Sequence, residues 1–166
     1  CSSDLKNIRD VIPFPRTPGH AQGRQALAAA IHGRKARVAV IGLGTGTLAC
    51  QSVSGEDWKY FEIDQTMVDT AKDPTKFTFV SQCMPDLKPV IGDARLTFAK
   101  EKDGTYDLII VDAYSSDAIP IHLATEEAMK IYKDKLAPHG AVVMHVSNRH
   151  LDLETVVVGI ADANDL

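Results

Sequence analysis

The sequence predicts an α/β fold in which the strands form one parallel sheet. Stretches typical of buried strands alternate along the chain with stretches typical of helices. The first of these strands runs into a loop with glycine at positions 42, 44 and 46, and several later strands end in an acidic residue. Right-handed crossovers between five such strands give the order 3-2-1-4-5, with the switch point between the first and fourth strands.

Composition limits the classes of protein to consider. The chain has 166 residues, of which 45% are hydrophobic and 24% charged, so it can form one domain with a real core. Its net charge of −4 includes no block of like charge, which argues against a nucleic-acid partner. No apolar run approaches the roughly 20 residues of a membrane span, and no leader segment is evident. We therefore expect neither nucleic acid nor membrane as a partner of the chain given.

The three cysteines, Cys1, Cys50 and Cys83, have neither the Cys-x-x-Cys nor the Cys/His spacing of a metal site. We expect no metal, and we interpret the cysteines as isolated thiols in a reducing compartment, which places the protein in the cytoplasm. The alternative is that Cys1, which is followed by Ser-Ser-Asp, is the first residue of a mature lipoprotein.

The beginning of the chain divides into two parts. Residues 1–19 contain three prolines and little periodicity, which predicts an extended lead-in rather than a core element. Residues 20–166 are expected to form a single α/β domain, whose ligand class the following elements indicate. Its first element is an alanine-rich helix from His20 to His32, ended by Gly33.

The first strand, Val38–Ile41, and the loop that follows it predict a ligand site. Glycine at alternate positions allows a sharp turn and brings backbone N–H groups close to a ligand, because no Cβ stands in the way. A helix over Thr47–Ser52 should follow the loop. We expect a nucleotide-like ligand held by the loop residues, which are Gly42, Gly44, Thr45 and Gly46.

The second strand, Trp58–Asp64, ends in two acids. Glu62 lies about 20 residues after the start of the glycine loop, the position at which doubly wound sheets place a carboxylate for ribose hydroxyls. Asp64 is expected to cap a helix over Gln65–Lys72 instead. An irregular stretch over residues 73–87, with one turn of helix, should lead to the third strand.

The third strand, Lys88–Ile91, ends just before Asp93, which opens a helix over Leu96–Lys100. Asp93 therefore lies at the carboxyl edge of the sheet, where ligands bind in such folds. Two roles stay open for this acid: capping the helix, or accepting a hydrogen bond from an adenine amino group while the N–H of Ala94 meets the ring.

The fourth strand, Tyr106–Asp112, is the most uniformly apolar and also ends in an acid. The loop over residues 113–120 adds Asp117 before a helix that begins near Thr125. Two carboxylates beside the glycine loop are the best candidates for chemistry. The alternative is that Asp112 caps and Asp117 is only solvated.

The last elements are a helix over residues 125–136, a turn at 138–140, a fifth strand over 141–146 and a helix over 151–163. Histidines at positions 122, 139, 145 and 150 have no metal-ligand spacing. We expect each of them to be a surface or loop residue.

Five motifs in order give a family resemblance. They are Gly42–Thr47, Phe61–Asp64, Gly92–Arg95, Val111–Pro120 and His145–Arg149. Together they resemble the spermidine synthase-like family, particularly the branch fused to transporter-like membrane segments, over about Val38–Ala161. The resemblance implies the Rossmann-like class I methyltransferase fold and an adenosyl-sulfonium co-substrate, either decarboxylated S-adenosylmethionine or S-adenosylmethionine itself.

The same resemblance implies roles for individual residues. Glu62 would hold the ribose hydroxyls, and Asp93 with Ala94 would meet the adenine. Asp112 would accept a proton from the attacking amine, while Asp117, with Tyr114 beside it, would bind the amine; an exchange of roles between the two acids is the alternative. The implied reaction is the transfer of an aminopropyl group to a polyamine.

Three departures from the family pattern modify this expectation. Thr45 stands where the family's loop usually has an acid that binds the aminopropyl ammonium. The N-terminal β-hairpin domain is not evident in residues 1–37, and the chain stops at Leu166, where the fold normally adds two more strands. The fifth strand would then be a bare edge, so we expect either a piece of a longer protein or a partner pairing there, with the former favoured. A homodimer is compatible with the resemblance.

Three functions follow. The first is an aminopropyltransferase, and the second is an S-adenosylmethionine-dependent methyltransferase, indicated by Thr45. The third is a non-catalytic nucleoside-binding module, indicated by the missing hairpin. A nicotinamide dehydrogenase is not expected, because Thr47 stands where the dinucleotide fingerprint has its third glycine.

Overall fold

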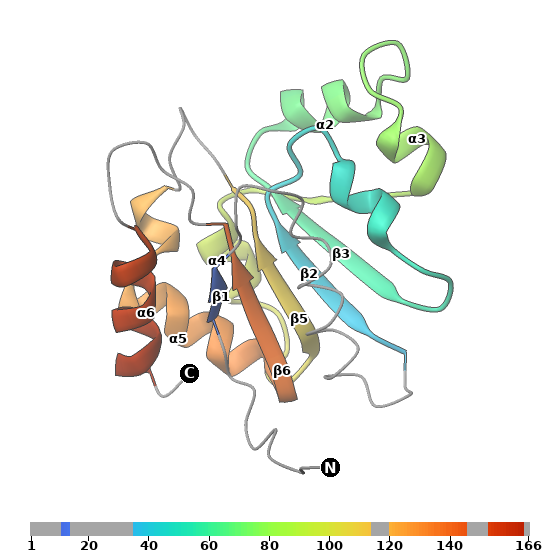
Figure 1. Cartoon of the computed structure of the whole chain (residues 1–166). Coiled ribbons are helices and arrows are strands. Elements are labelled where there is room, and N and C mark those ends of the chain that lie inside the picture. Colours follow the sequence, from blue (N-terminus) through green and yellow to red (C-terminus); the bar gives the residue numbers. More distant parts are fainter. Residues whose placement is uncertain (1–10, 14–34, 114–119, 146–152, 165–166) are drawn as a thin grey trace.

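A computed structural model describes residues 11–13, 35–113, 120–145 and 153–164 (Figure 1). Within them, a six-stranded sheet has the order β1-β6-β5-β2-β3-β4, and all of its pairs are parallel. The strands are β1 (Val11–Pro13), β2 (Arg37–Ile41), β3 (Asp57–Glu62), β4 (Val90–Ile91), β5 (Tyr106–Val111) and β6 (Leu136–Met144). The predicted order 3-2-1-4-5 corresponds to β4-β3-β2-β5-β6 and is confirmed.

The helices of the described residues follow the strands in alternation. They are η1 (Thr47–Gln51), α2 (Gln65–Lys72), α3 (Phe79–Cys83), α4 (Ala94–Phe98), η2 (Ile121–Leu123), α5 (Glu126–Lys135) and α6 (Leu153–Ala163). The helix predicted after the glycine loop is present, but η1 is a 3-10 helix rather than an α-helix. Asp64 caps α2 as predicted, because its side chain accepts a hydrogen bond from the Thr66 N–H at 2.8 Å.

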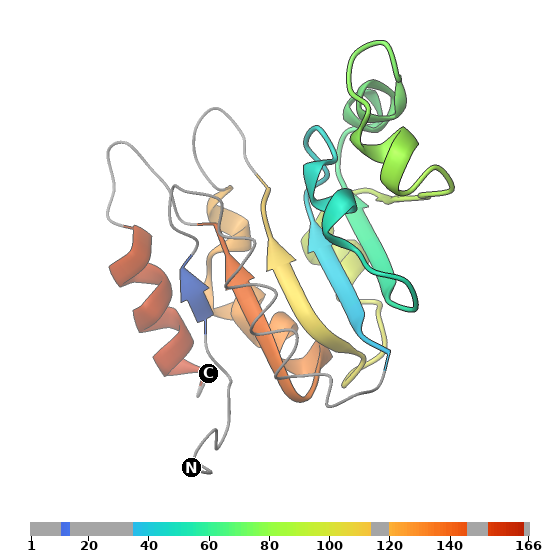
Figure 2. The ribbon, with the colours of Figure 1, turned by 45° about the vertical axis from the view of Figure 1, so that its right-hand side comes forward.

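The sheet separates two apolar clusters, because successive side chains of a strand point to opposite faces. In β2, Val38 and Val40 pack against η1, α2 and α3, whereas Ala39 and Ile41 pack against α4, η2, α5 and α6. Figure 2 shows the orange and red helices α5 and α6 beside β6 and β1, and the green helices α2 and α3 at the β2–β3 side. Helices therefore cover both faces of the sheet.

The first strand corrects one expectation from the sequence. Val11–Pro13 lies within the predicted lead-in, yet it pairs in parallel with β6, Val11 with Val142 and Pro13 with Met144. The edge of β6 that was expected to be bare is therefore covered. Proline is tolerated in an edge strand, where one side needs no ladder donor. The predicted helix at residues 20–32 and the domain boundary before it lie outside the described residues.

The strand β6 also differs from its prediction. It begins at Leu136, directly after α5, so the segment Pro138–Gly140 is part of the strand rather than a separate turn. A register shift against β5 occurs between the pairs of Tyr106 and Leu108, and His139 has a φ of 66°. An irregular strand can contain a residue with positive φ without ending.

The cysteines are a second correction. Cys50, in η1, and Cys83, in α3, form a disulfide with Cα atoms 5.0 Å apart, so they are not isolated thiols. The sequence shows two cysteines 33 positions apart, and only the packing of η1 against α3 brings them together. Disulfides are rare in reducing compartments, so the bond weighs against a cytoplasmic location, which stays a prediction.

No helix among the described residues is long and apolar enough to cross a membrane.

Candidate active site

The loop after β2 is held close to two neighbouring elements. Gly42 has a φ of +96°, and a Cβ at this position would lie 2.5 Å from the carbonyl oxygen of Asp112. A Cβ at Gly46, where φ is +84°, would lie 2.3 Å from a methyl group of Val80 in α3. Only glycine allows both contacts. The loop is therefore fixed between the end of β5 and α3.

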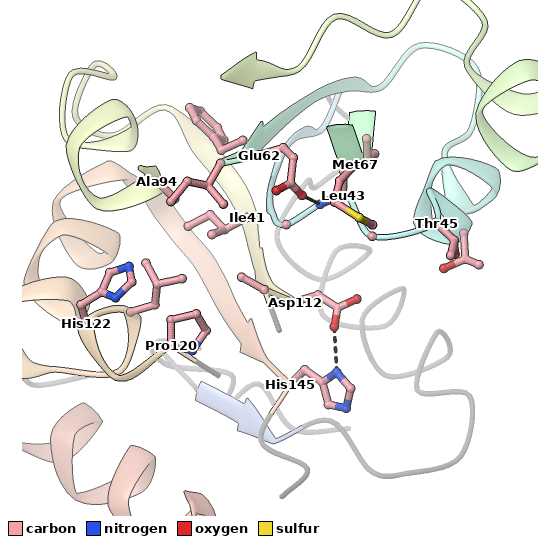
Figure 3. Close-up of a pocket in the computed structure, with 17 residues that line it drawn as sticks. Ile41, Leu43, Thr45, Glu62, Met67, Ala94, Asp112, Pro120, His122 and His145 are labelled. Carbon is pink, nitrogen blue, oxygen red and sulfur yellow. Dashed lines mark hydrogen bonds and ion pairs between the residues drawn. The ribbon is translucent and has the colours of Figure 1, made fainter. Parts of the chain in front are cut away.

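Glu62 ends β3 beside this loop, and its side chain is buried. Its Oε2 accepts a hydrogen bond from the Leu43 N–H at 2.8 Å, and its Oε1 accepts one from the Asp64 N–H at 3.1 Å. Figure 3 shows the first of these bonds. Each carboxylate oxygen can accept a further hydrogen bond. Glu62 is thus held in place and keeps capacity to bind donors such as ribose hydroxyls.

Asp93 lies at the start of α4, where its Oδ1 accepts a hydrogen bond from the Arg95 N–H at 2.8 Å. The capping role left open by the sequence is therefore present. Its Oδ2 lies 3.8 Å from His122 Nε2. Ala94 lines the pocket described below, whereas Asp93 is not among the lining residues.

Asp112 and His145 stand side by side at the carboxyl ends of β5 and β6. Asp112 Oδ1 and His145 Nδ1 are 2.7 Å apart, and both side chains are partly exposed. His145 is a partly exposed loop residue just after β6, as expected, and it also lines the pocket described below. Residues that end neighbouring parallel strands meet at one edge of the sheet, which brings these two side chains together.

A pocket of about 440 Å³ unites these groups. Its walls combine the glycine loop, the ends of β3 and β5, and the segment around η2 (Figure 3). The lining residues are Ile41, Gly42, Leu43, Gly44, Thr45, Thr47, Phe61, Glu62, Ile63, Met67, Ala94, Asp112, Ala113, Pro120, His122, Leu123 and His145. Its size and mixed apolar and polar lining are typical of small-ligand sites.

Most predicted site residues meet in this pocket. Those that line it are Gly42, Gly44, Thr45, Glu62, Ala94 and Asp112. Gly46 packs against Val80 and shapes the loop without lining the pocket. Asp117 and Tyr114 lie outside the described residues. Met67, His122 and His145 also line the pocket, although no motif in the sequence predicted their contribution.

Leu123, one of the lining residues, is held by Tyr132 of α5. Its hydroxyl donates a hydrogen bond to the carbonyl oxygen of Leu123, 3.0 Å away. Burial raises the pKa of Tyr132, so the hydroxyl stays a donor over the working pH range. Leu123 is thereby held at its position in the lining.

The described residues contain no group of three or more histidine, cysteine, aspartate or glutamate side chains arranged to hold a metal ion. The lining of the pocket, as far as the structure describes it, also contains no lysine or arginine. Two carboxylates and two imidazoles are its titratable groups. The two carboxylates favour a cationic ligand.

Comparisons with known proteins agree with this architecture. A family model described as the spermine/spermidine synthase domain matches residues 25–162. A curated protein of Bifidobacterium longum, named a probable polyamine aminopropyl transferase, is 30% identical, with 65% of this chain and 23% of that protein covered.

Two solved structures have the same fold. Spermidine synthase from Thermotoga maritima has a TM-score of 0.66 and 18% identity, with 87% of this chain and 50% of that chain covered. A SAM-dependent methyltransferase from Archaeoglobus fulgidus has a TM-score of 0.55 and 16% identity, with 86% of this chain and 66% of that chain covered. The chain thus spans about half the length of the solved synthase and a quarter of the curated relative.

Proposed function

This chain belongs to the spermine/spermidine synthase domain family, and we propose that it is the nucleoside-binding part of an aminopropyltransferase. Its donor would be decarboxylated S-adenosylmethionine and its acceptor a polyamine. The observation that carries the proposal is one pocket in which Glu62 and Asp112 flank the glycine loop.

The charges of the pocket support a cationic donor and a cationic acceptor. Both a sulfonium and a polyamine are positively charged, and carboxylates attract them. The described lining contains two carboxylates and no lysine or arginine. Apolar side chains such as Ile41 and Met67 offer surface for a purine ring.

Each candidate residue takes one role in this proposal. Glu62 accepts hydrogen bonds from the ribose hydroxyls, and the backbone at Ala94, with Asp93 beside it, meets the adenine. The glycine loop lies against the sulfonium end. Asp117 and Tyr114, which the sequence places after β5, bind the amine acceptor.

Asp112 acts as the proton acceptor of the transfer. The lone pair of a neutral amine nitrogen forms a bond to the aminopropyl carbon, and the bond from that carbon to sulfur breaks. The electron pair of this bond stays on sulfur, which leaves as the thioether of methylthioadenosine. The proton lost by the new ammonium moves to the carboxylate of Asp112.

A methyltransferase is the second candidate, and Thr45 favours it. Thr45 lines the pocket at a loop position where an acid would bind the aminopropyl ammonium. A threonine hydroxyl offers no charge for that ammonium, whereas it can donate to the carboxylate of S-adenosylmethionine. The same Asp112 would then serve a methyl transfer.

Turnover separates the two candidates. The purified chain is incubated with decarboxylated S-adenosylmethionine and putrescine, cadaverine or spermidine, and methylthioadenosine is quantified. We expect product that disappears in Asp112→Asn and persists in Asp86→Asn, an exposed aspartate outside the pocket. Formation of S-adenosylhomocysteine from S-adenosylmethionine, with no methylthioadenosine, would favour the methyltransferase instead.

Ligand binding is tested separately, because a ligand held only by the native state raises the melting temperature. We expect methylthioadenosine to stabilise the chain and NAD to have no effect. Glu62→Gln should abolish the stabilisation, and Asp86→Asn should retain it. Binding without any turnover would identify a non-catalytic nucleoside-binding module.

A further inference from the structure

Asp112 and His145 project from rigid backbone just beyond their strands. Val111 and Met144 are register partners in β5 and β6. The next backbone N–H groups still belong to the sheet: that of Asp112 donates to the Ile41 carbonyl at 2.9 Å, and that of His145 donates to the Val111 carbonyl at 2.9 Å. The relative position of the two side chains is therefore set by the sheet rather than by a loop.

The bond between the side chains has a defined direction. An ionised carboxylate offers only acceptors, so the hydrogen of the 2.7 Å contact is assigned to Nδ1 of His145. The bond uses Oδ1 of Asp112. Figure 3 shows the second oxygen of Asp112 directed away from His145. His145 thus orients one oxygen and leaves the other for a ligand.

The Asp112–His145 pair contributes little to the stability of the fold. The side chains of Asp112 and His145 are 38% and 31% exposed, and water screens an ion pair at such positions. Both residues line the pocket. A contact that adds little to folding and stands in a ligand site is better explained by the chemistry of the site.

The other titratable groups of the described lining are engaged elsewhere. Both oxygens of Glu62 accept backbone N–H groups, and His122 from η2 lies 3.8 Å from Asp93. His145 is therefore the imidazole of the described lining that contacts Asp112 directly. Its protonation changes the charge of the pair from minus one to zero.

We propose that His145 is the positioning residue of the proton acceptor, and that Asp112 and His145 work as one pair; this rests on the proposed function. The transferred proton moves from the nitrogen to Oδ2 of Asp112 while Nδ1–H of His145 remains bonded to Oδ1. A neutral imidazole leaves the carboxylate fully basic. An imidazolium lowers its basicity, so turnover rises as His145 loses its proton.

Two variants of His145 separate its two contributions. In His145→Asn the side-chain amide nitrogen takes the place of Nδ1, so the hydrogen bond is kept and the titration is lost. In His145→Leu both are lost. His139→Asn is the matched control, because His139 is an exposed residue near the start of the same strand and its φ of 66° is tolerated by asparagine.

The kinetic test measures kcat against pH for all four proteins. We expect His145→Leu to lower kcat about 10- to 100-fold, the usual cost of a misplaced reacting group. His145→Asn should recover most of kcat and keep only the part of the acid limb that comes from the acceptor amine, and His139→Asn should match the wild type. If both His145 variants keep the wild-type kcat and pH profile, the proposal is wrong.

NMR spectroscopy tests the Asp112–His145 pair even if no acceptor substrate is found. Imidazole nitrogen resonances of the chain should show Nδ1 protonated in neutral His145. An unprotonated Nδ1 would overturn the proposal independently of turnover.

Discussion

The two ends of the same parallel strands use polar residues in opposite ways. At the amino ends, Lys59 of β3 donates to both oxygens of Glu101 at 2.8 and 2.9 Å, and the Tyr106 hydroxyl of β5 donates to Glu101 at 2.7 Å. At the carboxyl ends, Glu62 and Asp112 stand in a pocket. The amino-end groups satisfy one another, whereas the carboxyl-end groups keep acceptor capacity toward a ligand. The presence of an acidic residue in a strand therefore does not by itself indicate a functional site. The groups that bind its carboxylate must also be known.

Strand β5 and the residue that follows it show both uses of an acidic residue. Asp107, near its start, is fully buried, and its Oδ2 accepts the Arg37 N–H at 2.8 Å. Asp112, just after its end, is partly exposed in the pocket. The same substitution at both positions tests the comparison directly.

The largest effect is expected for Asp112→Asn. Removing a general base costs about 10²- to 10⁴-fold in kcat. The melting temperature should change little, because the asparagine carbonyl can still accept from His145. Steady-state kinetics and thermal unfolding check the two expectations. Equal losses of activity and stability would contradict the assignment of this end to chemistry.

The next effect concerns the disulfide beside the glycine loop. Replacing Cys50 and Cys83 together by alanine should destabilise the fold by roughly 2–4 kcal/mol, because the bond closes a long loop in the unfolded chain. Urea unfolding of the oxidised protein and the double variant measures this. A reducing agent should lower the stability of the wild type alone.

Asp107→Asn should have a smaller effect than Asp112→Asn, and it should lower stability rather than activity. The part-buried N–H of Arg37 keeps an acceptor in the asparagine carbonyl but loses a charged one, which costs about 1 kcal/mol of stability. Turnover of the folded fraction should remain at the wild-type level. A loss of kcat with unchanged stability would erase the distinction between the two strand ends.

The smallest effect concerns the pH dependence of stability at the amino ends. Burial raises the pKa of Glu101, but hydrogen bonds from Lys59 and Tyr106 outweigh it and hold the pKa below its ordinary value of 4.5. Since the unfolded chain binds the proton first, this contribution is present above about pH 4.5 and is lost as pH falls through the folded pKa. Melting temperatures between pH 7 and pH 3 should fall less steeply in Glu101→Gln, and identical slopes would contradict this.

Local patterns in the sequence predicted much of this molecule. The strands β2 to β5, the cap at Asp64 and the place of Glu62 follow from apolar runs, glycine spacing and short-range hydrogen bonds. The missed features depend on distant partners. β1 has two β-branched residues and a proline, and only its pairing with β6 makes it a strand. His145 gains its role from the register of β6 against β5, which no local pattern specifies.

The pairing of β1 with β6 also affects how the chain folds during synthesis. Val11 is synthesised before its partner Val142, and most of the described residues lie between them. Until then the first strand has no β6 edge on which to add, and the acid at the end of β5 has no imidazole beside it. Long-range pairing of this kind is slow to form. A chain interrupted before β6 would have the glycine loop without the contact between Asp112 and His145.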